Sequence, residues 1–128
     1  MDDSLHWDVG ESQHALTRIY EIDKGLTTLE TLLNHGIHVW VEGAKLKFWI
    51  PDKTLKEETP DHIHNIKTMA SRCKPDIIAA VSDPDSIRKA LSDAQSAVAE
   101  LFNHSSILED DLQRLSEAVK RRNNDNNR

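Results

Sequence analysis

The sequence contains seven histidines and one cysteine, which are its best candidates for metal binding or catalysis. Imidazole nitrogens and thiolates are the usual protein ligands of zinc. His62 and His64 lie two positions apart on an expected helix, so their side chains point to different faces. His35 and His38 flank a glycine turn, and the sequence offers no matched third and fourth ligand for them. We therefore expect no metal site and no other cofactor.

Nucleophilic and acid–base chemistry find no better support. Cys73 shares the apolar side of an expected helix with Ile66 and Met69, where a free cysteine acts as a small buried hydrophobe. The acidic pairs Glu57-Glu58 and Asp110-Asp111 are neighbours in sequence, which is typical of solvated helix starts rather than of a cleft. Four glycines form no phosphate-binding loop. We expect no catalytic residues and a non-enzymatic protein.

Binding chemistry is concentrated in residues 37–50, IHVWVEGAKLKFWI, which predict a β-hairpin. Gly43-Ala44 suits a two-residue loop with glycine at the first central position, as in a type II′ turn. Counting back from this turn pairs Val41 with Leu46, and side chains on a strand alternate between faces. One face is then apolar and consists of Ile37, Val39, Val41, Leu46, Phe48 and Ile50.

The opposite face of this hairpin carries two tryptophans and two lysines, which is more than a surface meeting only water requires. A strand at the edge of a sheet also offers unpaired backbone groups to an added strand. The predicted partner-binding residues are His38, Trp40, Lys45, Lys47 and Trp49. The alternative is that Trp40 and Trp49 are covered by the helices at either end of the chain, or by a second copy of it.

The sequence divides into four parts. Residues 1–26 form an extension with a short helix over 11–23, ended by Lys24-Gly25. Residues 27–82 form a small module, residues 83–122 a helical appendage and residues 123–128 a disordered tail. The module begins with a helix capped by Thr27 and Glu30 and ended by Gly36 in the left-handed C′ position.

Two proline signals organise the module after the hairpin. Residues 52–58 form a polar connection, with Leu55 turned inward. Thr59-Pro60 is an N-cap followed by proline at the first helical position, so a helix begins there. Pro75 interrupts that helix, and a short further helix completes the module.

The appendage carries a heptad seam that predicts either a helical hairpin or a coiled coil. Ser106 and Glu109 form a capping box, which favours a break at residues 103–106 and two helices folded back on each other. The unbroken spacing, with Ser105 in the vacant seam position, favours one long helix that dimerises. The seam residues are Ile87, Leu91, Ala94, Val98, Leu101, Leu108, Leu112, Leu115 and Val119.

Composition limits the partners. The 128 residues are 38% hydrophobic and carry a formal net charge of −6. The negative charge argues against general binding to nucleic acid or a membrane surface. Single strands stacking on Trp40 and Trp49 remain a lesser option. One cysteine, an acidic N-terminus and the lack of a long apolar run predict a cytoplasmic protein.

The stretch LETLLNHGIHVWVEGAKLKFWIPDKTL, followed by TPDHIHNIKTMASRCKPDIIAAV, resembles the N-terminal docking domains of nonribosomal peptide and polyketide synthases, of the tubulysin-synthetase type. The resemblance covers residues 27–82. It implies an αββαα fold of the α+β class, a homodimer, and a partner peptide added as a strand along the hairpin. By position, it implies that Lys45, Lys47 and Trp49 contact this peptide.

The chain departs from the family in carrying an extension before the module and a helical appendage after it, and it has no HHxxxDG motif of a condensation domain. We therefore expect a docking module that either stands alone or is a piece of a longer protein. Stand-alone relatives of this module are similar to accessory proteins of mobile elements. The alternative function is accordingly a mobile-element or phage accessory or inhibitor protein, acting on a host or replication complex by acidic mimicry of nucleic acid.

Overall fold

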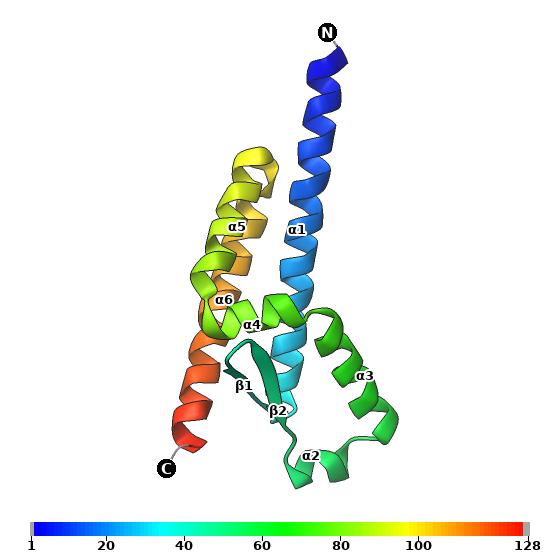
Figure 1. Cartoon of the computed structure of the whole chain (residues 1–128), viewed down its shortest axis with the longest axis vertical. Coiled ribbons are helices and arrows are strands. Elements are labelled where there is room, and N and C mark those ends of the chain that lie inside the picture. The colour runs from blue at the N-terminus through cyan, green and yellow to red at the C-terminus, as the bar shows by residue number, and fades with distance from the viewer. Residues whose placement is uncertain (1, 127–128) are drawn as a thin grey trace.

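The computed structural model describes residues 2–126, and side-chain surroundings for residues 13–99 and 101–123. Helices dominate this part of the chain, and one antiparallel hairpin accompanies them, which is compatible with the expected α+β class. Figure 1 shows the hairpin packed among the helices. The elements are α1 (Asp2–Asn34), β1 (His38–Glu42), β2 (Lys45–Trp49), α2 (Asp52–Glu57), α3 (Pro60–Arg72), α4 (Lys74–Ser82), α5 (Pro84–Ala97), the 3₁₀ turn η1 (Ala99–Leu101) and α6 (Phe102–Asn126).

Helix α1 runs for 33 residues without a break, across the expected boundary at residues 26 and 27. The predicted helix end at Lys24-Gly25 and the predicted cap at Thr27 are therefore wrong. Gly25 is buried inside the helix, where α4 crosses it. A Cβ atom placed on Gly25 would lie 2.8 Å from the Cβ of Asp76. The glycine provides clearance for this crossing rather than a helix end.

The end of α1 follows the sequence prediction. Gly36 has a φ of 75°, and its N–H donates to the Leu33 carbonyl at 3.0 Å. The Ile37 N–H donates to the Leu32 carbonyl, also at 3.0 Å. These two bonds form a Schellman motif, which reverses the chain into β1.

The hairpin has the predicted register. His38 pairs with Trp49, Trp40 with Lys47 and Glu42 with Lys45. Gly43 has a φ of 62°, whereas Ala44, like every other non-glycine residue described, has a negative φ. This combination fits a type II′ turn, since a type I′ turn needs positive φ at both central residues.

The segment after the hairpin is more ordered than the sequence predicts. Residues 52–57 form helix α2 rather than a polar connection. Thr54 is the residue that turns inward, because its hydroxyl donates to the His35 carbonyl at 2.6 Å, while Leu55 is 50% exposed. The predicted start of α3 is confirmed: the Thr59 hydroxyl accepts from the His62 N–H at 3.1 Å.

The appendage folds back as a helical hairpin, one of the two predicted forms, but the break lies earlier than expected. Helix α5 ends at Ala97 and Val98 is extended, with φ −135° and ψ 100°. Residues 103–106 lie inside α6, so the predicted capping box at Ser106 is wrong. Helix α6 continues to Asn126, so residues 123–126 are helical rather than a disordered tail, and residues 127 and 128 lie outside the described part.

The seam residues pack inside one chain. Helices α5 and α6 contact each other and both contact α1, and Figure 1 shows α5 and α6 running alongside α1. The seam residues therefore form the core of a three-helix bundle of α1, α5 and α6. Val98 is partly buried at the turn, and the other seam residues are buried, namely Ile87, Leu91, Ala94, Leu101, Ser105, Leu108, Leu112, Leu115 and Val119.

The crossing of α1 and α4 predicts that Gly25→Ala lowers the free energy of unfolding, although helix propensity alone predicts an increase. In an open helix, Gly25→Ala would raise the free energy of unfolding by about 1 kcal/mol. The 2.8 Å approach to Asp76 should outweigh this gain, since overpacking costs about 1–3 kcal/mol. We expect a lower midpoint in urea unfolding for Gly25→Ala, and a change within about 0.5 kcal/mol for the exposed control Thr17→Ala. A more stable Gly25→Ala variant would contradict the crossing.

A second test concerns the polar residue in the seam. The Ser105 hydroxyl oxygen is buried and has no hydrogen-bond partner in the described part of the chain. An unsatisfied buried polar group costs about 1–3 kcal/mol, so Ser105→Ala should raise the free energy of unfolding. The exposed neighbour Ser106→Ala should gain only the smaller helix-propensity difference. Equal gains in chemical denaturation would show that the Ser105 hydroxyl carries no such cost.

Candidate functional site

The outer face of the hairpin brings the predicted binding residues together. Trp49 is 55% exposed and Lys45 is exposed, whereas His38, Trp40 and Lys47 are partly buried. The alternative of covered tryptophans therefore holds in part for Trp40 and not for Trp49, which is accessible. The ring centroids of His38 and Trp49 lie 4.9 Å apart. Lys47 faces Trp40 in register, and the structure shows no cation–π contact for this pair among the described side chains.

The outer edge of β1 is closed by the end of α6. Arg122 Nη1 donates to the Ile37 carbonyl at 3.1 Å. Asn123 Nδ2 donates to the Val39 carbonyl at 3.4 Å. Burial, together with the positive charge of Arg122, lowers the pKa of His38 below its ordinary value. Two outward carbonyls along the edge of β1 are therefore occupied within the chain itself.

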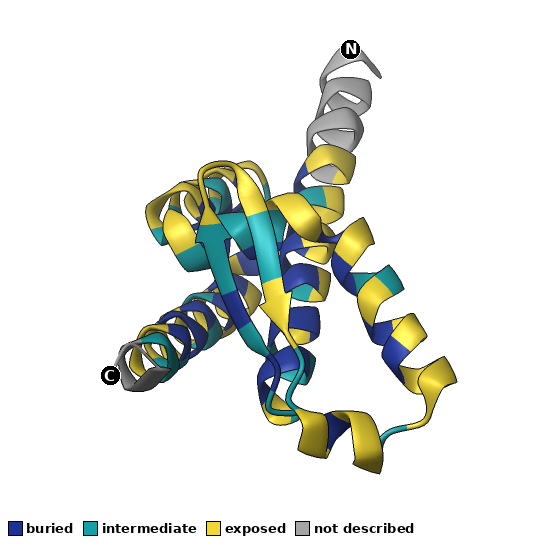
Figure 2. Cartoon of the chain, turned by 60° about the horizontal axis from the view of Figure 1, so that its bottom comes forward, coloured by how far each residue is buried: buried dark blue, intermediate teal, exposed yellow. Residues whose placement is uncertain are grey.

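The outer edge of β2 is open. Since Glu42 and Lys45 flank the turn, the main-chain groups of Leu46 and Phe48 point away from β1. The sheet has two strands, so β2 has no strand on that side. Within the described part of the chain, no other segment hydrogen-bonds to the main chain of Leu46 or Phe48. Figure 2 shows β2 on the outside of the molecule, largely exposed.

A shallow apolar crevice lies between this open strand and α3. Its free volume is about 10 Å³, which admits the tips of side chains rather than a separate ligand. Phe48, at 37% exposure, forms part of its rim. The residues that line it are Leu32, Ile37, Phe48, Ile50, Ile63, Ile66, Lys67 and Ala70.

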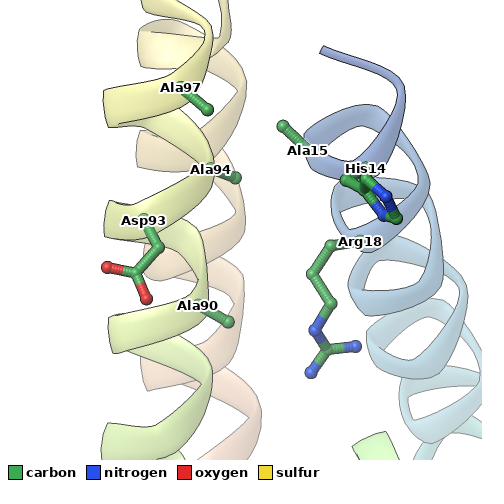
Figure 3. A pocket seen from close by; sticks show the side chains of 7 residues that line it. All are labelled: His14, Ala15, Arg18, Ala90, Asp93, Ala94 and Ala97. Atoms are coloured by element: carbon green, nitrogen blue, oxygen red, sulfur yellow. The ribbon is translucent and has the colours of Figure 1, made fainter. Parts of the chain in front are cut away.

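A larger pocket of about 340 Å³ lies between α1 and α5. Figure 3 shows alanine side chains from the two helices facing each other across it. Charged and polar side chains in the lining are His14, Arg18 and Asp93. His14 and Asp93 are exposed, so this pocket holds no buried polar group that would orient a ligand.

One cluster escaped the sequence analysis. His35 Nδ1 lies 3.2 Å from Glu58 Oε1, and His62 Nδ1 lies 2.5 Å from Glu58 Oε2. As candidate metal ligands, the sequence analysis paired His35 with His38 and His62 with His64, whereas the structure brings His35 and His62 together at Glu58. The only local signal for this cluster was Glu58, which lies four residues before His62 and directly before the Thr59-Pro60 helix start.

Comparison with known proteins adds no identification. No protein-family model, curated protein or solved structure matches the chain. None of the described helices has both the length and the apolar character needed to cross a membrane.

The closed β1 edge yields a test with a neighbouring control. Arg122→Ala should lower the free energy of unfolding by about 1–2 kcal/mol, because the Ile37 carbonyl loses a charged donor. It should also move the pKa of His38 upward, while burial keeps that pKa below its ordinary value. Urea unfolding and NMR titration of His38 measure the two effects. The exposed Arg121→Ala should change neither, and identical behaviour of both variants would contradict the closed edge.

Proposed function

We propose that this chain is a non-enzymatic docking module that binds an extended peptide segment of a protein partner along β2. The difference between the two edges of the hairpin carries the proposal. Arg122 and Asn123 bind two carbonyls along the edge of β1, while no strand of the described chain pairs with the outer edge of β2, toward which the main-chain groups of Leu46 and Phe48 point. Addition of a strand to such an edge is a recurrent mode of peptide recognition.

The surroundings of β2 define the peptide that fits. Side chains of an added strand alternate between the two faces of the sheet. On one face they meet the apolar crevice beside Phe48 and Ile63. On the other face they meet Lys45, Lys47 and Trp49. The preferred segment therefore alternates apolar and acidic residues over about five positions, which is the length of β2.

The resemblance to synthase docking domains supports the same proposal, because that family receives a peptide on its hairpin. The order of α1, the hairpin, α3 and α4 follows the αββαα order that this resemblance implies, with α2 added. A homodimer belongs to the proposal as well. It would use a surface other than the seam, because the seam residues are buried within one chain.

The decisive experiment selects displayed peptides on the wild-type protein and then measures their affinity for variants. We expect enrichment of alternating apolar and acidic residues. Lys47→Glu should weaken binding at least about tenfold, since it places like charge opposite the peptide. Lys89→Glu, an exposed substitution on α5, makes the same change in net charge and should leave affinity unchanged. Equal loss in both variants would indicate a general charge effect instead of docking at β2.

A backbone variant tests the edge itself. Leu46→Pro removes an N–H that points away from β1, so the hairpin ladder can persist. We expect this variant to lose peptide binding, while Leu46→Ala, which keeps the N–H, retains it. Circular dichroism checks that both variants fold. Retained binding by a folded Leu46→Pro would refute strand addition, and a steep fall of wild-type affinity with salt would favour acidic mimicry of nucleic acid.

A further inference from the structure

The ends of three helices converge on the His35–Glu58–His62 cluster. His35 directly follows the last residue of α1, Glu58 is the C-cap residue of α2, and His62 lies in the first turn of α3. Their potential ligand atoms all lie within 4.8 Å of one another. In Figure 1, α2 follows the end of β2 at the bottom of the view, and α3 starts next to α2.

We propose that this cluster is a zinc site, in which His35 Nδ1, His62 Nδ1 and the Glu58 carboxylate bind the ion. Two imidazoles and one carboxylate are a donor set used by open zinc sites, which keep the fourth position for water. The same set suits other divalent transition metals, and Zn²⁺ is among the tighter binders in that series.

Both distances to the Glu58 carboxylate lie within about 1 Å of the spacing that this coordination requires. Zinc–ligand bonds of 2.0–2.1 Å in a tetrahedron place the ligand atoms about 3.3 Å apart. The 3.2 Å separation between His35 Nδ1 and Glu58 Oε1 meets this requirement. His62 Nδ1 forms a hydrogen bond to Glu58 Oε2 and would withdraw by about 1 Å to bind the ion. It has room to do so, since the His62 side chain is 46% exposed.

Backbone and side-chain contacts hold the three ligand residues in place independently of an ion. The Thr54 hydroxyl fastens α2 to the His35 carbonyl at 2.6 Å. The Thr59 hydroxyl accepts from the His62 N–H and fixes the first turn of α3. The two imidazole rings meet edge to face, with centroids 5.1 Å apart. Contacts of this kind orient the ligands of metal sites. The fold therefore holds the three residues near one another before an ion binds.

Zinc would join the end of α1 to the start of α3. Helix α3 contacts α1 and α4, and its Ile63 and Ile66 form one wall of the apolar crevice. The ion would thus hold this wall in position. The metal site itself rests only on the cluster and does not depend on peptide docking.

The test uses the full chain, stripped of metal with a chelator and titrated with Zn²⁺ in a calorimeter and with Co²⁺ in a spectrophotometer. We expect one equivalent of Zn²⁺ to bind, and Co²⁺ to give the intense visible absorption of a four-coordinate ion. His35→Gln, Glu58→Gln and His62→Gln should each weaken binding at least about tenfold. Zn²⁺ should raise the thermal midpoint of the wild type by more than that of these variants.

Two neighbouring positions provide matched controls. His64→Gln and Glu57→Gln remove exposed side chains of the same types outside the cluster, and they should leave Zn²⁺ affinity unchanged. Circular dichroism without metal confirms that each variant folds. Equal weakening by His62→Gln and His64→Gln, or absence of one-equivalent binding, would overturn the proposal and assign any uptake to surface histidines. NMR shifts of the ring nitrogens should identify Nδ1 of His35 and of His62 as the zinc ligands.

Discussion

The uninterrupted helix α1 is the constraint on which the rest of this structure depends. Helices α3, α4, α5 and α6 and strand β1 all contact it. Its buried side, which includes Ile22, Leu26 and Leu29, serves both the hairpin module and the appendage. The two parts therefore share one core along one helix. The close crossing at Gly25 sets how near α4 approaches, and α4 in turn contacts both strands of the hairpin.

The length and position of α6 determine which side of the hairpin stays open. Because the chain turns back at Val98 and α6 begins at Phe102, this helix is long enough to bring Arg122 and Asn123 to β1. These residues provide donors for the outward carbonyls of Ile37 and Val39. The same packing leaves β2 as the outer strand, beside the crevice formed with α3. The appendage thus closes one edge and directs the proposed peptide to the other.

Local features of the fold were predictable because the groups that cause them lie within a few residues of one another. The turn at Gly43-Ala44 sets the register of the hairpin, and Gly36 sets the end of α1. Thr59-Pro60 sets the start of α3. The five residues of the candidate interface follow from the same register, since alternation along two paired strands places His38, Trp40, Lys45, Lys47 and Trp49 on one face.

The sequence by itself thus determined the hairpin, its two faces, the helix boundaries at Gly36 and Pro60, and the seam that becomes buried. Only the tertiary structure decided that Gly25 lies inside a helix, that the appendage breaks at Val98, and that the edge of β1 is closed. It also decided that His35 and His62 share Glu58. The physical reason is the same in each case: these outcomes depend on contacts between segments tens of residues apart, and local propensity carries no information about such contacts.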